Sequence, residues 1–82
     1  MAQKDIYSEF MSNQDDARKR LIQVLIYEPM TLQDLSATIG MQEDTLRSFL
    51  KKGINVKELT FLKILNYIVR KEREHSIPPL KD

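Results

Sequence analysis

The 82-residue sequence predicts an all-α fold, a compact bundle of four or five helices around one core. Apolar residues recur every three or four positions in four segments, and no segment alternates apolar and polar residues with period two. Pro29, Gly40, Gly53 and the Pro78-Pro79 pair fall between these segments. A chain of this length buries too little surface for two cores, so one helical domain is expected.

Three regions follow from this division. Residues 1–11 form a polar amino-terminal arm, residues 12–74 form the helical domain, and residues 75–82 (HSIPPLKD) form an extended tail because proline cannot continue a helix. The arm carries four large apolar side chains, so it either packs on the core as a helical turn or is mobile.

The first predicted helix covers about residues 13–28. Ser12 or Asn13 can cap its amino end, two aspartates in the first turn suit the helix dipole, and Pro29 ends it. Apolar side chains cover more than half of its circumference. It is therefore expected to be the central buried helix or to have partners on two sides.

Two short helices should follow, joined at a glycine. Thr31 can cap the first of them through the pattern TLQD, and Gly40 suits the left-handed conformation that ends a helix. The next helix should cover about residues 42–52, carry its Leu and Phe residues inward, and close at Gly53.

The last predicted helix covers about residues 56–74. Its apolar side chains form two groups at helical spacing. The first group forms a helical stripe and the second a shoulder beside it: Leu59, Leu62, Leu65, Ile68 and Val69, then Phe61 and Ile64.

The charge of the chain is segregated rather than large. Net charge is only +1, so total charge makes no case for nucleic acid. Basic residues gather in three groups, and the first of them is expected to form a solvated face, with contact to phosphate as the alternative: Arg18, Lys19 and Arg20.

The sequence shows no catalytic constellation. It has no cysteine, no glycine-rich phosphate loop and one histidine, His75, which is expected to be solvated near a helix end. No apolar run approaches the roughly 20 residues of a membrane span, and the amino terminus lacks a secretory signal. The expectation is a cytoplasmic protein without enzymatic activity, metal or cofactor, and not in a membrane.

The segment TLQDLSATIGMQEDTLRSFLKKG has the residue types that two tightly crossing helices need. Ser36 is small where the next helix passes over it, Gly40 makes the turn, and Met41 and Leu46 bridge the crossing. From residue 18 to 68 the chain resembles the lambda-repressor-like helix-turn-helix family, through LQDLSATIGMQEDTLRSFLKKGINVKELTFLKILNYI.

The resemblance implies a transcriptional regulator that binds specific duplex DNA sequences as a homodimer and acts as a repressor, with residues 42–52 as recognition helix. Three groups of contacts are implied. Base edges would be met by Glu43, Asp44 and Ser48, the flanks by Gln42, Arg47 and Lys51, and phosphates by Thr31, Gln33, Lys52 and Asn55.

The sequence departs from the family at three places. Leu32 stands where glutamine often opens the second helix, with Gln33 one residue later. No proline follows the third helix, and the usual fifth helix, which often helps to form the dimer, is missing or replaced by the tail. Dimer geometry therefore cannot be carried over from the family.

Three questions have two possible answers each. Glu43 and Asp44 either accept hydrogen bonds from cytosine or only complement the helix dipole, and a domain of this fold can instead serve as a protein-binding adaptor or antagonist. The apolar excess either surrounds a small core or forms a homodimer interface: Ile22, Ile26, Tyr27, Phe61, Ile64 and Tyr67.

Overall fold

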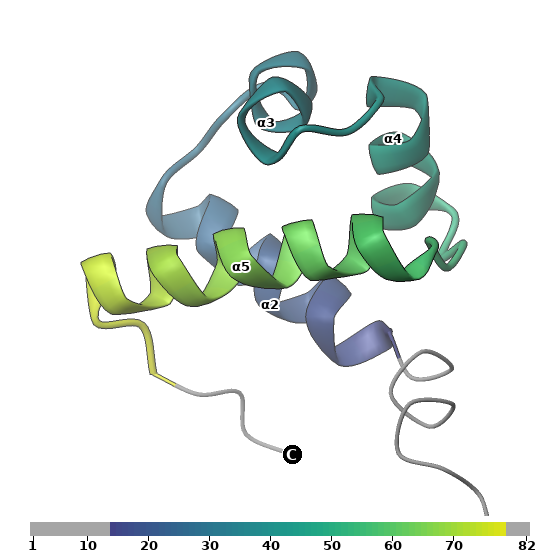
Figure 1. Cartoon of the computed structure of the whole chain (residues 1–82). Coiled ribbons are helices and arrows are strands. Elements are labelled where there is room, and N and C mark those ends of the chain that lie inside the picture. The colour runs from purple at the N-terminus through teal and green to yellow at the C-terminus, as the bar shows by residue number, and fades with distance from the viewer. Residues whose placement is uncertain (1–13, 79–82) are drawn as a thin grey trace, which may run out of the picture.

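The computed structural model describes residues 14–78, which form four helices and no strand (Figure 1). This confirms the predicted all-α fold, and each helix lies within about two residues of its predicted bounds. The predicted arm at residues 1–11, the candidate caps Ser12 and Asn13, and residues 79–82 of the tail lie outside the described residues. The helices are α2 (Asp15–Tyr27), α3 (Leu32–Ile39), α4 (Glu43–Lys51) and α5 (Glu58–His75).

The helices are arranged as a crossed pair with a second pair on top. α5 packs across α2, while α3 and α4 pack against each other and cover one side of that pair (Figure 1). All four helices contribute to one core, which also includes a residue of the α4–α5 connection. Its buried members are Ala17, Leu21, Val24, Leu35, Ile39, Leu46, Phe49, Val56, Phe61, Ile64, Tyr67 and Ile68.

Gln14, at the amino end of α2, clamps the connection between α4 and α5. It occupies the N-cap position of α2, but its side chain does not cap the helix. Its Nε2 donates to the Val56 carbonyl at 3.0 Å, and its Oε1 accepts from the Val56 N–H at 2.9 Å. Gln14 is 1% exposed, so the carboxamide replaces water for both backbone groups of a buried residue. No local pattern in the sequence marks Gln14, because its partner lies 42 residues along the chain.

Arg18 is buried rather than solvated, which corrects the expectation for the first basic group. Its guanidinium donates to the backbone carbonyls of Phe49 and Ile54, to Oδ1 of Asn55 and to the carboxylate of Asp15. It also lies 4.5 Å from the centroid of the Phe49 ring. The last carbonyls of a helix have no partner within that helix, and Arg18 supplies a donor at the end of α4.

Ion pairs join α2 to the last turns of α5. Arg20 donates to both oxygens of Glu72, at 2.9 and 2.7 Å, and this hydrogen bonding raises the pKa of Arg20. Glu28 lies 2.9 Å from Lys71 Nζ and 2.8 Å from Nε2 of His75, and these hydrogen bonds lower its pKa. Arg20 and His75 were expected to be solvated. Instead both hold α5 to α2.

The buried face of α5 includes both residues of the predicted shoulder, Phe61 and Ile64, whereas most of the predicted stripe is not buried. Apolar side chains occupy most of the circumference of α5, and the face with the aromatic rings buries more apolar area when turned inward. Ile68 of the first group is buried, and Leu65 packs at the edge of the core. The exposed members are Leu59 at 73%, Leu62 at 43% and Val69 at 36%.

α5 also begins later and ends later than expected. Val56 belongs to the non-helical connection because Gln14 pairs with its backbone, and the helix begins at Glu58. Its last residue is His75, the first residue of the predicted extended tail, and Ser76 ends it in the left-handed conformation with φ 51°.

We expect Gln14→Ala to destabilise the protein by about 2 to 4 kcal/mol, because the Val56 N–H and carbonyl lose their partner in a buried position. Urea unfolding followed by circular dichroism measures this loss. Gln23→Ala removes the same side chain from a partly exposed position of α2 and should change stability by about 0.5 kcal/mol or less. Equal losses in the two variants would contradict the clamp.

Candidate nucleic-acid interface

α3 and α4 are joined by a turn of three residues with defined ends. The Thr31 hydroxyl accepts from the Asp34 N–H at 3.1 Å and caps α3, as predicted. Gly40 ends α3 in the left-handed conformation (φ 90°, ψ 45°). The N–H groups of Gly40 and Met41 both donate to the Ser36 carbonyl, at 2.9 and 3.0 Å. This hydrogen bonding closes the end of α3 and fixes the direction in which α4 leaves the turn.

A small side chain of α3 and two large side chains of α4 are buried in this part of the protein. Ser36 is 5% exposed, and its hydroxyl donates back to the Gln33 carbonyl at 2.8 Å, so its polar atom is satisfied. Leu46 and Phe49 of α4 are fully buried. Ser36, Leu46 and Phe49 are therefore inside the protein as predicted, whereas Met41 is half-buried and packs against the edge of the core.

The outer face of α4 carries the residues that the sequence predicted for base edges and flanks. The exposed fraction of the side chain differs from residue to residue. Asp44 has 90% of its side chain exposed, Glu43 41% and Arg47 42%. Gln42 and Lys51 are exposed and Ser48 is half-buried.

Two of the predicted base-reading carboxylates are paired with the arginine beside them. Arg47 donates through Nη1 to Asp44 Oδ1 at 2.6 Å and through Nη2 to Glu43 Oε2 at 2.8 Å. One guanidinium against two carboxylates leaves this group with a net charge of −1. Exposed ion pairs of this kind contribute little stability, so the pairing affects the local potential more than the fold.

The predicted phosphate contacts lie at two separate places. Thr31 and Gln33 are exposed at the amino end of α3, about 12 Å along that helix from the turn. Lys52 and Asn55 are exposed after α4, and Oδ1 of Asn55 accepts from Arg18 Nη2 at 3.4 Å. The predicted phosphate contacts therefore come from the start of α3 and from the connection that follows α4.

A shallow groove of about 280 Å³ runs beside α4. It includes three of the predicted residues, and Ile54 gives it an apolar wall that is 52% exposed. Its lining residues are Asp44, Thr45, Ser48, Ile54, Asn55 and Val56.

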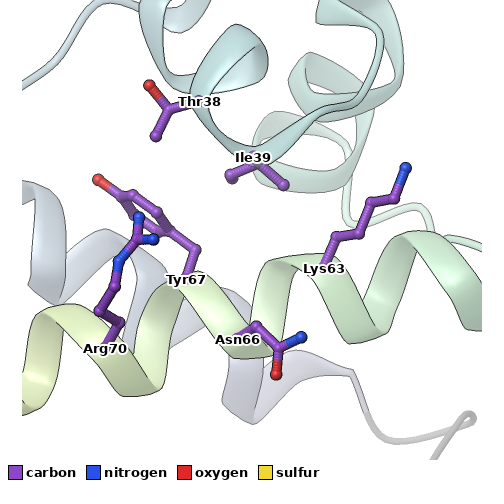
Figure 2. Close-up of a pocket in the computed structure, with 6 residues that line it drawn as sticks. All are labelled: Thr38, Ile39, Lys63, Asn66, Tyr67 and Arg70. Atoms are coloured by element: carbon purple, nitrogen blue, oxygen red, sulfur yellow. The ribbon is translucent and has the colours of Figure 1, made fainter.

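A cation from α5 lies at the α3–α4 turn, a position that local sequence patterns do not predict. Lys63 of α5 donates from Nζ to the Gly40 carbonyl at 3.1 Å, which brings its charge to the α3–α4 turn. The same lysine lines a pocket of about 190 Å³ between α3 and α5 (Figure 2). The pocket is lined by two segments that are at least 24 positions apart in the sequence, and no local sequence pattern relates the two segments. Its lining residues are Thr38, Ile39, Lys63, Asn66, Tyr67 and Arg70.

One group of potential metal ligands lies at the carboxyl ends of α2 and α5. Ligand atoms of Glu28, Glu74 and His75 lie within 4.8 Å of one another. However, Nζ of Lys71 is 2.9 Å from Glu28 and 3.2 Å from Glu74. The lysine thus supplies the positive charge between these carboxylates, and the group is an ion-pair network.

No family model, no curated protein and no solved structure matches this chain. The resemblance to the lambda-repressor-like family therefore remains an expectation from the sequence. Within residues 14–78, no helix has both the length and the apolar character that crossing a bilayer requires.

We expect Ser36→Leu to destabilise the protein by about 1 to 3 kcal/mol, because the added methylenes overpack a buried position between two helices. Thermal unfolding of the variant measures the effect. Ala37→Leu adds comparable volume at the next, exposed position of α3 and serves as the control. An unchanged melting temperature in Ser36→Leu would contradict the tight crossing.

Proposed function

We propose that this protein binds duplex DNA through the outer face of α4 and acts as a transcriptional regulator, a repressor that occupies a promoter. The observation that carries the proposal is the geometry of the two helices before and after Gly40. An eight-residue helix, a three-residue turn with a left-handed glycine and a nine-residue helix with a polar outer face form a unit that fits a major groove. The resemblance in sequence supports the same assignment.

Cations and backbone N–H groups near α4 supply the phosphate contacts in this proposal. Lys51 and Lys52 extend from the end of α4 and are exposed. The amino end of α3, with Thr31 and Gln33, presents the positive end of the helix dipole, and its first turn is capped by Thr31. These contacts position the protein on the duplex and carry no sequence information.

Sequence is read by the first turn of α4. On DNA, Arg47 leaves its two carboxylates and turns to a phosphate or a guanine edge. Glu43 or Asp44 then accepts a hydrogen bond from the N4 amino group of cytosine.

A homodimer completes the proposal, because one half-site offers few contacts for specific binding. Exposed apolar side chains on α2 and α5 support it: Ile22 at 46%, Ile26 at 73%, Leu59 at 73% and Leu62 at 43%. Of the residues named from the sequence for this interface, Phe61, Ile64 and Tyr67 are buried in the core and take no part. A cytoplasmic location without catalysis or cofactor belongs to the same proposal.

A second candidate is a protein-binding adaptor or antagonist. The net charge of −1 on the Glu43, Asp44 and Arg47 group favours it, because this group lies where a recognition helix would first meet the anionic duplex. In this alternative, α4 would present the same face to a basic surface of a protein partner.

We expect the full chain to bind a random duplex with an affinity that falls steeply with salt, since neutralised phosphates release counterions. Lys51→Ala should weaken binding to all sequences and reduce the slope of log K against log salt by about one.

Glu43→Ala or Asp44→Ala should instead relax the preference at one base pair by about 1 to 3 kcal/mol and leave the slope nearly unchanged. Fluorescence anisotropy with a selected operator and its single-base variants measures both quantities.

Two outcomes would count against these assignments. Absence of binding at low salt would favour the protein-binding alternative. Tighter binding of both carboxylate variants to every sequence, with unaltered preference, would make the acids helix-dipole partners rather than base readers.

We expect the protein to sediment as a dimer at micromolar concentration and Ile26→Glu to sediment as a monomer, because a charge would be buried in the interface. Ala37→Glu, at an exposed position of α3, should leave the dimer intact. Sedimentation velocity measures this, and a monomeric native chain at all concentrations would exclude the interface.

A further inference from the structure

The pocket between α3 and α5 has a cationic rim and an apolar floor. Ile39 and the ring of Tyr67 form the buried floor, and the longer polar side chains stand around it (Figure 2). Its volume of about 190 Å³ is slightly larger than a cavity that holds a benzene molecule. The pocket therefore fits one small group or molecule rather than a long chain.

The charged residues that line the pocket are all basic. Lys63 and Arg70 line the pocket, and none of its six lining residues, all in the described part of the chain, is acidic. Glu74 approaches Arg70 Nε at 4.0 Å, the outer limit of an ion pair, and Lys63 uses one of its three donors on the Gly40 carbonyl. Both cations thus retain donors for a ligand.

The Tyr67 hydroxyl is a donor with a weak partner. Tyr67 is 3% exposed, and its hydroxyl donates to the thioether sulfur of Met30 at 3.2 Å. Sulfur is a poor acceptor, so a buried hydroxyl gains by turning to an anionic oxygen. Burial raises the pKa of Tyr67, which keeps the hydroxyl protonated at neutral pH. In Figure 2 this hydroxyl lies on the side of the pocket nearest Arg70 and Thr38.

We propose that this pocket binds a phosphate group, with the phosphoryl oxygens between Arg70 and the Tyr67 hydroxyl and the ligand body over Ile39 toward Lys63. A phosphomonoester carries a charge between about −1.5 and −2 at neutral pH, which complements the two cations. Arg70 can bind two of its oxygens at once, as guanidinium groups commonly do. The site is separate from the outer face of α4 and does not depend on the function proposed for that face.

Amide spectra of the full ¹⁵N-labelled chain test the site with phenyl phosphate and inorganic phosphate as probes. We expect saturable shifts confined to the pocket residues with both probes, because both carry the phosphoryl group that Arg70 and the Tyr67 hydroxyl would bind. Arg70→Met should weaken binding about tenfold, since a charge-assisted pair of hydrogen bonds is lost. Tyr67→Phe, which removes the hydroxyl alone, should weaken it about threefold or more.

Arg73→Met is the matched control. Arg73 is an exposed cation on the same helix that does not line the pocket, so its loss should leave the phosphate affinity unchanged. Equal weakening in Arg73→Met and Arg70→Met would mean diffuse attraction and would overturn the site. The absence of saturable shifts in the native chain at millimolar phosphate would overturn it as well.

A competition experiment with duplex DNA distinguishes the two possible sources of the phosphate group. If the group belongs to the DNA backbone, duplex displaces phenyl phosphate and Arg70→Met also binds DNA more weakly. If it belongs to a free phosphomonoester, both ligands bind at once and Arg70→Met retains its DNA affinity. Either result supports the pocket as a phosphate site, and phosphate binding in a chain that fails to bind DNA would refute only the function proposed for α4.

Discussion

The buried guanidinium of Arg18 organises the region behind α4. The end of a helix leaves carbonyl groups without partners, and in the last turn of α4 the Phe49 carbonyl is in a buried position although residues 51–55 are exposed. Arg18 supplies donors to the Phe49 and Ile54 carbonyls while its plane lies over the Phe49 ring. One charged side chain therefore satisfies backbone groups and packs against the core at the same time, which a lysine at this position would not do equally well.

Gln14 extends the same arrangement by one turn of α2. Arg18 and Gln14 together engage the backbone of the α4–α5 connection at Ile54 and Val56, a segment without helical hydrogen bonds of its own. The orientation of α4 thus depends on polar side chains of α2 as well as on apolar packing. The direction in which the outer face of α4 points therefore also depends on these contacts.

Local signals in the sequence predicted the helices well and the long-range contacts poorly. Thr31 and Gly40 are helix ends whose conformation depends on residues three or four positions away, so both could be recognised directly. The inward face of α5 could not, because apolar residues surround that helix and only its packing partners select a face. Arg18 looked like a surface cation because its partners lie more than 30 residues along the chain. The pocket at Lys63 and Tyr67 was missed for the same reason.

The clamps at the two ends of α2 also determine how the chain must fold. Gln14 meets Val56 across 42 residues, and Glu28 meets His75 across 47, so α3 and α4 lie within loops that close only when α2 and α5 have found each other. Closing loops of this length costs chain entropy before the contacts repay it, which is unusual for a small helical protein rich in local contacts. α3 and α4 are consequently not an independent folding unit: excised from between α2 and α5, the two short helices would lose the surface that holds them in place.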